Sequence, residues 1–141
     1  MQKFIGNGVF EDVSALAQKY TFEFKTLPKA QERGRIGKFG NIYIPKKSQD
    51  FKREIKKEIT HFWKREPLQQ DLYVEIAFRF ERPKSVKRPY PSVKPDIDNC
   101  TKILLDSLNK YLWHDDSLII GLKAIKLYAT IPGIDLNVYV L

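Results

Sequence analysis

Residues 72–80 read Leu-Tyr-Val-Glu-Ile-Ala-Phe-Arg-Phe, and this stretch decides the fold more than any other in the chain. Every second side chain is large and apolar, so an extended backbone presents one apolar face and one mixed face. The alternation therefore predicts a β-strand with one buried face. Its apolar positions are Leu72, Val74, Ile76, Phe78 and Phe80.

Segments on both sides of this strand carry related patterns and predict further strands. Residues 20–27 alternate in the same way, residues 42–44 form a short candidate strand, and residues 134–140 alternate after a Pro-Gly turn. Residues 118–129 are rich in β-formers, but their alternation is imperfect, which predicts a bulge. Residues 29–41 are rich in Gly, Lys and Arg and predict a loop or an irregular hairpin.

Two segments instead have the three-to-four-residue spacing of amphipathic helices. The first is predicted from Ser48, as N-cap, to about Trp63, and the second from about Asp98 to about Leu112. Their expected buried stripes are Phe51, Ile55, Ile59 and Phe62 in the first and Ile103, Leu104, Leu108, Tyr111 and Leu112 in the second.

The order of these elements predicts the fold class. Strands and helices are mixed, without a βαβ rhythm that carries a Gly-rich phosphate turn, which favours an α+β fold over a doubly wound sheet. We expect a single domain over residues 20–141 with a mixed β-sheet and two main helices. Residues 1–19 are weakly patterned and are taken as an N-terminal extension.

Composition limits the class of protein. The chain has 141 residues, 43% of them hydrophobic and 30% charged, which suits one compact domain. No apolar run reaches the roughly 20 residues of a membrane span, and the start has no apolar signal-peptide core. One cysteine and two histidines exclude an internal disulfide and a Cys/His zinc site within one chain. We therefore expect a cytoplasmic protein.

Charge is distributed unevenly. The net charge is +8, and residues 29–65 carry 12 basic and 4 acidic side chains. Residues 79–94 carry 6 basic and 1 acidic side chain, whereas residues 95–141 carry 4 lysines and 6 aspartates. A basic surface attracts polyanions, nucleic acid first, through steering and counterion release. The basic part of the chain therefore predicts nucleic-acid binding.

Acidic residues follow directly after a proline-rich basic segment, residues 81–95. Asp96 and Asp98 stand at the expected start of the second helix, and Lys102 and Asp106 continue along one face of that helix. The pair Asp115-Asp116 opens the next strand, and it joins the first two carboxylates if that strand runs back beside the helix start. Clustered carboxylates without nitrogen or sulfur ligands favour magnesium, with manganese as a substitute.

Each piece also has an ordinary structural interpretation. Asp98 alone is an N-cap, Asp115-Asp116 a solvated turn, and Lys102 a partner for surface i,i+4 ion pairs. The combination favours a catalytic role, because a polyanion attracted to the cations of residues 82–94 would be repelled by these carboxylates unless metal ions intervene.

The other polar and aromatic residues give weaker indications of function. We expect His61 to pack, His114 to be incidental, Cys100 to be a small residue of the first helical turn, and Tyr90 to be the best placed aromatic for touching a base.

At these residues the sequence resembles the RusA-like Holliday-junction resolvases, small homodimeric endonucleases of phage and prophage origin. The family pattern matches Asp96-Ile97-Asp98-Asn99, Lys102, Asp106 and Trp113-His114-Asp115-Asp116-Ser117, and Arg33-Gly34-Arg35 resembles a basic segment upstream. The resemblance covers roughly residues 20–141. The first 19 residues have no counterpart in it, and residues 81–95 are longer than the family pattern.

The resemblance implies both the reaction and the roles of these residues. Asp96, Asp98 and Asp116 would be the catalytic carboxylates that hold magnesium, and Lys102 the catalytic cation. From the charge of the two basic segments, we also expect DNA to be bound by Arg33, Arg35, Lys84, Lys87, Arg88 and Lys94. The expected function is a magnesium-dependent endonuclease that nicks four-way DNA junctions as a symmetric dimer in recombination and repair.

Two alternatives stay open from the residues. One is a nuclease for other branched DNA, such as flaps or forks, because phosphate contacts say little about branch shape. The other is a basic nucleic-acid-binding module without catalysis, in which the aspartates only cap helices and form turns.

Overall fold

The computed structural model describes residues 18–141. The predicted N-terminal extension therefore lies outside the described residues, except for Gln18 and Lys19, which belong to the first strand. None of the described helices is long and apolar enough to cross a bilayer.

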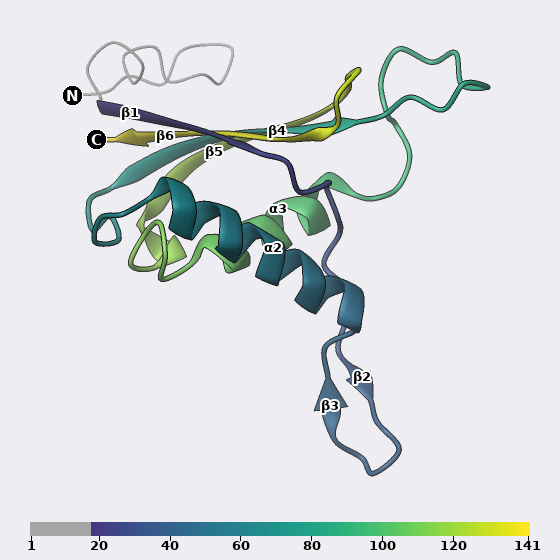
Figure 1. Cartoon of the computed structure of the whole chain (residues 1–141), viewed down its shortest axis with the longest axis horizontal. Helices are drawn as coiled ribbons and strands as arrows, with labels where there is room; N and C mark the ends of the chain where they lie inside the picture. The colour runs from purple at the N-terminus through teal and green to yellow at the C-terminus, as the bar shows by residue number, and fades with distance from the viewer. Residues whose placement is uncertain (1–17) are drawn as a thin grey trace.

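A four-stranded mixed sheet forms one layer of the molecule (Figure 1). Its strands are β1 (Gln18–Phe24), β4 (Leu72–Phe80), β5 (Ile119–Tyr128) and β6 (Gly133–Val140), in the order β1-β6-β4-β5. β6 is antiparallel to both β1 and β4, and β4 is parallel to β5. The predicted bulge is present, because Leu72 pairs with Ile119 and Tyr73 with Gly121, so Ile120 is the extra residue.

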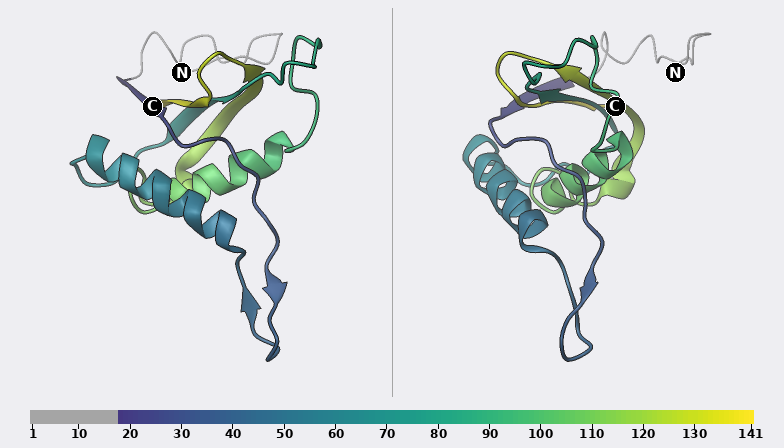
Figure 2. Two further views of the ribbon diagram at one scale, coloured as in Figure 1. Left: turned by 45° about the vertical axis from the view of Figure 1, so that its right-hand side comes forward. Right: turned by 90° about the vertical axis from the view of Figure 1, so that its right-hand side faces the viewer.

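Two helices, α2 (Lys46–Phe62) and α3 (Ile97–Leu108), cover one face of the sheet (Figures 1 and 2). The core between the layers contains the apolar face of β4 as predicted, with Leu72, Val74 and Phe78 fully buried. α3 connects the two parallel strands, since a parallel pair needs a crossover rather than a hairpin. The predicted α+β fold, with a mixed sheet and two main helices, is confirmed.

Three details of the predicted elements are wrong. β1 ends at Phe24 rather than at residue 27, because the amides of Lys25 and Thr26 bond to Glu58 on α2. α2 begins at Lys46, so Ser48 lies buried in the first turn, where its Oγ accepts from the Glu32 amide at 3.3 Å.

The third detail is the extent of the buried stripes. Phe62 is 46% exposed, and Trp63 takes the buried position at the end of α2. α3 stops at Leu108 rather than Leu112, because Lys110 adopts a left-handed φ of 73° and its amide bonds to the Trp113 carbonyl. Leu112 is nonetheless buried from the turn that follows the helix, whereas Tyr111 is exposed.

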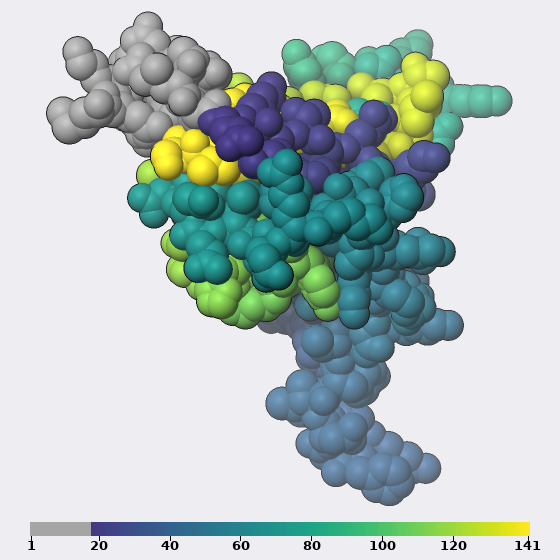
Figure 3. Space-filling view, turned by 60° about the vertical axis from the view of Figure 1, so that its left-hand side comes forward, coloured from purple at the N-terminus to yellow at the C-terminus, as the bar shows by residue number. Residues whose placement is uncertain are grey.

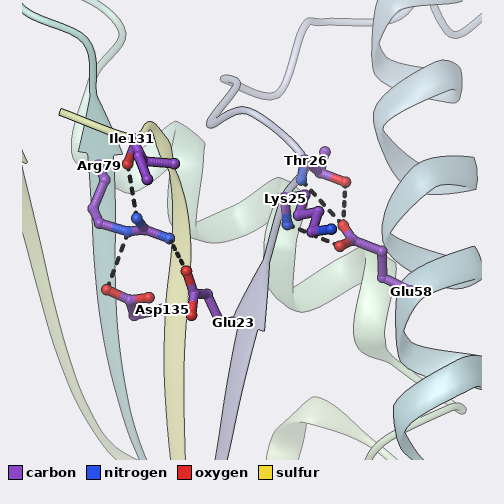
Figure 4. A network of polar contacts seen from close by, with 7 residues as sticks. All are labelled: Glu23, Lys25, Thr26, Glu58, Arg79, Ile131 and Asp135. Atoms are coloured by element: carbon purple, nitrogen blue, oxygen red, sulfur yellow. Dashed lines mark hydrogen bonds and ion pairs between the residues drawn. The ribbon is translucent and has the colours of Figure 1, made fainter. Parts of the chain in front are cut away.

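Two groups of polar contacts lie around β1, one across the sheet at Arg79 and one to the helix layer at Glu58 (Figure 4). Arg79 on β4 donates to Glu23 Oε1 at 3.1 Å and to the Ile131 carbonyl at 2.7 Å, and it lies 3.2 Å from Asp135 Oδ2. Glu58 accepts from the Lys25 and Thr26 amides and from Thr26 Oγ1. The Arg79 contacts therefore join β1 to β4 within the sheet, and the Glu58 contacts join the residues after β1 to α2.

Two basic segments project from this body. Residues 33–47, here called the arm, contain the predicted hairpin: β2 (Arg35–Ile36) pairs antiparallel with β3 (Ile42–Tyr43). Residues 81–95, here called the basic loop, form no helix or strand, as predicted. The arm projects from the helix side and the basic loop from the sheet side, with the start of α3 between them (Figures 1 and 2).

Candidate active site

The start of α3 holds two of the predicted carboxylates. Asp96 occupies the N-cap position with an extended backbone, but its side chain makes no capping hydrogen bond. Asp98 lies in the first helical turn, and its Oδ1 accepts from the Asn99 amide at 2.9 Å. Both side chains are exposed. Asp98 is therefore not the N-cap, and both carboxylates lie where free amides and the helix dipole favour negative charge.

One face of α3 continues from Asp98 into an open surface cavity of about 510 Å³. The i, i+4, i+8 spacing places Asp98, Lys102 and Asp106 on this face as predicted. Within residues 18–141, neither Lys102 nor Asp106 forms an ion pair, so the interpretation as surface ion pairs is not supported. The other residues that line the cavity are Ile97, Thr101, Leu105, Asp116, Leu122 and Ala124.

The two aspartates before β5 have different environments. Asp115 is the N-cap of a short 3₁₀ turn, Asp116–Leu118, and accepts from the Ser117 amide at 3.2 Å. These hydrogen bonds from Ser117, assisted by Lys110 at 3.7 Å, lower the pKa of the Asp115 carboxyl. Asp116 instead lines the cavity. The structure therefore gives Asp115 a capping role and leaves Asp116 facing the space along α3.

The predicted carboxylates do not all meet within one chain. Asp96 and Asp98 lie at the start of α3, whereas Asp116 opens the 3₁₀ turn before β5 and lines the same cavity as Asp98. Because β5 is parallel to β4, it begins beside the end of α3 and not beside its start. Figures 1 and 2 show this opposite placement. Among residues 18–141, no three His, Cys, Asp or Glu side chains are close enough to hold a metal ion together.

The donor set at the start of α3 nevertheless fits a hard divalent cation. Asp96 and Asp98 offer only carboxylate oxygens, the donors that magnesium and manganese prefer. Magnesium in phosphate-handling enzymes is commonly held by one or two carboxylates, with water and substrate phosphate completing the octahedron. Two carboxylates at an open site match that pattern better than a closed protein cage.

Sequence reasoning missed one residue that organises this site, Lys126 on β5. Its Nζ donates to the carbonyls of Val93 at 2.7 Å and Pro95 at 2.9 Å, so it holds the end of the basic loop immediately before Asp96. Burial raises the pKa of the nearby Cys100 thiol to about 11, and Lys126 opposes that rise while Asp96 and Asp98 add to it. One lysine in a β-strand pattern gives no signal of such a role, because the contact depends on the parallel placement of β5.

The predicted DNA-binding residues lie in the two projections. Arg33 and Arg35 are exposed at the arm, and Lys84, Lys87 and Lys94 are exposed in the basic loop. Arg88 differs, because it is partly buried and its Nε is enclosed without a hydrogen-bond partner among the described residues. It lines a small cavity together with Lys94 and Lys126, so its role includes shaping the loop.

The structure also shows the positions of the other residues for which the sequence makes single predictions. Tyr90 is 65% exposed in the basic loop, His114 is exposed, and Cys100 is buried in the first turn of α3. His61 is exposed rather than packed, although its ring lies 5.6 Å from that of Phe62.

Comparison with known proteins adds to this geometry. Residues 25–139 match the family model described as endodeoxyribonuclease RusA. The chain is also similar to a protein of Bacillus subtilis (strain 168) described as uncharacterized protein YqaN, with 38% identity over 48 residues. That match spans 34% of this chain and only 34% of the relative's own length. The family match covers most of the chain, including α3 and its cavity, and the chain therefore belongs to the RusA family of endodeoxyribonucleases, a family of Holliday-junction-resolving nucleases.

Proposed function

We propose that this chain is a magnesium-dependent, structure-selective endonuclease that nicks four-way DNA junctions as a symmetric homodimer. It would act in the cytoplasm, in recombination and repair, and manganese would substitute for magnesium. The observation that carries the proposal is the face of α3 with Asp98, Lys102 and Asp106, here called the acidic face of α3. It continues from the helix start, which lies between two cationic projections in a chain of net charge +8. A phosphodiester drawn in by the projections would meet carboxylates and the ammonium group of Lys102.

Each residue of the site would have a role that depends on its position. Asp96 and Asp98 would hold the cation at the start of α3 and orient a water toward the scissile phosphate. Lys102, one turn along from Asp98 and without an ion pair in the described chain, would stabilise negative charge that develops on the phosphate oxygens. Lys126 would hold the backbone before Asp96 in place, as a positioning residue. When bound, the divalent ion would supply Lewis-acid polarisation of the phosphate.

The homodimer is supported by the finding that, among residues 18–141, no three carboxylates are close enough to share a metal ion. Carboxylates that share one magnesium each lie about 2.0–2.1 Å from it, and within the described residues Asp116 lines the cavity without forming such a group with Asp96 and Asp98. Asp116 is therefore proposed to complete the site of a second copy rather than its own. A two-fold axis would then make two such sites, one for each strand to be cut.

A cleavage assay tests the proposal directly. The purified chain is incubated with a labelled four-way junction, a matched duplex and a matched flap, each with and without magnesium. Paired symmetric nicks in the junction alone, only with magnesium, are the expected result. Preferential cutting of the flap would show that the substrate is another branched DNA and not the four-way junction. Binding without cleavage under any divalent ion would show that the chain is a nucleic-acid-binding module and not an enzyme.

A further inference from the structure

The arm, residues 33–47, has a surface that the proposed chemistry does not explain. Its cations are Arg33, Arg35 and Lys38, with Lys46 and Lys47 where it joins the start of α2, and it contains no acidic residue. Between them stand apolar side chains that contact water: Ile36 and Ile42 are each 77% exposed and Phe39 is 90% exposed. Figure 3 shows the arm standing clear of the body. Contiguous exposed apolar groups of this kind mark interaction sites.

The tip is shaped to present Phe39. The Gly37 amide bonds to the Asn41 carbonyl, the Gly40 amide bonds to the Gly37 carbonyl at 3.0 Å, and Gly40 has a φ of +79°. Glycine takes that left-handed backbone without strain, so the turn closes tightly and leaves Phe39 at its apex. At about 3.3 Å per extended residue, the chain from Arg33 to Phe39 spans roughly 20 Å, enough to cross a groove of a DNA duplex.

The base of the arm is fixed to the site. The Gln31 amide donates to the Asn99 carbonyl at 3.1 Å, next to Asp98 in the first turn of α3. The Glu32 amide donates to Ser48 Oγ on α2, and Gln49 Nε2 donates to the Ile44 carbonyl at 2.6 Å. The tip is thus held at a defined reach from the acidic face of α3, although a two-stranded hairpin alone is only marginally stable in water.

We infer that the arm is a DNA-reading wedge, in which Phe39 stacks on bases that are unpaired or unstacked at a branch point. This inference rests on the proposed function. Charge selects the partner, because an all-cationic arm repels a second copy of a basic chain and attracts a polyanion. An aromatic side chain gains by stacking on a base face, and apolar wedges are known to enter base steps and kink DNA.

Selectivity follows from the cost of reaching a base. In a paired duplex every base face is already stacked, so Phe39 must open a step, whereas a branch point offers weakened steps. Stacking of one base on an aromatic corresponds to roughly 5- to 150-fold in Kd. Loss of Phe39 should therefore weaken binding to junctions and leave binding to duplex within about twofold, because phosphate contacts of the cations remain.

The test measures Kd for junction and duplex by anisotropy in EDTA, with 2-aminopurine placed at the branch point. Phe39→Leu keeps an apolar side chain and removes the ring, Phe39→Trp restores a ring, and Phe62→Leu removes an exposed ring at the far end of α2 as a matched control. We expect Phe39→Leu alone to raise the junction Kd and abolish the change in 2-aminopurine fluorescence. Unchanged junction Kd and fluorescence in Phe39→Leu would overturn the wedge.

Two further measurements separate the possible failures. Sedimentation of each variant shows whether Phe39→Leu dissociates a dimer, and such dissociation would overturn the wedge in favour of an arm that joins two copies. Cleavage by the wild-type chain in magnesium is measured in parallel. If the wild type neither prefers nor cuts junctions, the proposed function fails and the wedge with it. If it cuts junctions while Phe39→Leu binds them normally, the wedge alone is wrong.

Discussion

A substitution at Asp98 separates the effect on stability from the effect on catalysis. Asp98→Asn keeps the side-chain oxygen that accepts from the Asn99 amide, and the residue is exposed in the first turn of α3. The free energy of unfolding should therefore change by less than about 0.5 kcal/mol. Loss of one negative charge from the cation site should lower the junction cleavage rate about 10²-fold or more.

The measurement pairs single-turnover cleavage with thermal melting. Asp115→Asn is the matched control, since Asp115 caps the 3₁₀ turn and pairs with Lys110 away from the cavity. Binding of junction without metal should hold or tighten in Asp98→Asn, because one carboxylate near the phosphates is gone. Wild-type cleavage by Asp98→Asn with an unchanged melting temperature would show that Asp98 is not a ligand.

A second single-residue prediction concerns Lys126. Lys126→Met leaves the carbonyls of Val93 and Pro95 without their charged donor, so the backbone before Asp96 loses its fixed position. Because the side chain is only partly buried, we expect a loss of about 1–3 kcal/mol in the free energy of unfolding. The magnesium concentration for half-maximal cleavage should also rise, which a purely structural defect would not cause.

Urea unfolding and a magnesium titration of cleavage give the two readouts. Lys123→Met is the control, because Lys123 is an exposed lysine on the same strand. If Lys126→Met lost stability but kept the wild-type magnesium dependence, Lys126 would only support the fold.

Among the elements, the arm and the basic loop carry the electrostatic prediction. The double variants Arg33→Gln/Arg35→Gln and Lys84→Gln/Lys87→Gln each remove two exposed cations. Removing one cation that binds a phosphate should reduce the log–log salt slope of junction binding by about 0.9, so each double variant should reduce it by about 1.8. Melting temperatures should stay unchanged.

Binding isotherms over a range of salt concentrations measure these slopes. Lys57→Gln/Lys64→Gln removes two exposed cations from the α2 region, away from the arm and the basic loop, and should leave the slope as it is. If all three double variants kept the wild-type salt slope, the arm and the basic loop would not contact phosphate.

The elements also show how far sequence can predict this molecule. Alternation in residues 72–80 and 134–140 correctly predicted strands β4 and β6 with their buried faces, because a two-residue period depends only on local geometry. The parallel pairing of β5 with β4 could not be read from alternation, since pairing is a choice between distant segments. The separation of Asp116 from Asp98 follows from that pairing, and so does the contact of Lys126 with Pro95. Helix ends shifted for local reasons, such as the left-handed Lys110.

At the scale of the whole molecule, complementation between copies tests the proposed dimer. Asp98→Asn and Asp116→Asn should each be inactive alone. If Asp116 completes the site of a second copy, a mixed dimer has one site with both substitutions and one site with neither. Mixing and equilibrating the two variants should therefore restore nicking at about a quarter of the wild-type sites.

Sedimentation at micromolar concentration must first show dimer mass for the wild type. A mixture of the Asp98→Asn and Asp96→Asn variants is the matched control. One chain supplies both Asp96 and Asp98 to a site, so each site of the mixed dimer carries one substitution and neither site is intact. Restoration in neither mixture, with exchange of subunits verified, would place all three carboxylates in one chain.

The position of β6 has a kinetic consequence. β6 is the last strand along the chain, yet it lies between β1 and β4, and Gln18 pairs with Val140 across almost the whole described length. Until residues 133–140 have been synthesised, β1 has no strand to pair with, and the sheet cannot grow beyond β4 and β5. Closing so long a loop is entropically costly, and folds dominated by such distant pairings form slowly. During that interval the apolar faces of β1 and α2 are exposed to other chains, so removal of the second half of β6 should turn a folding chain into an aggregating one.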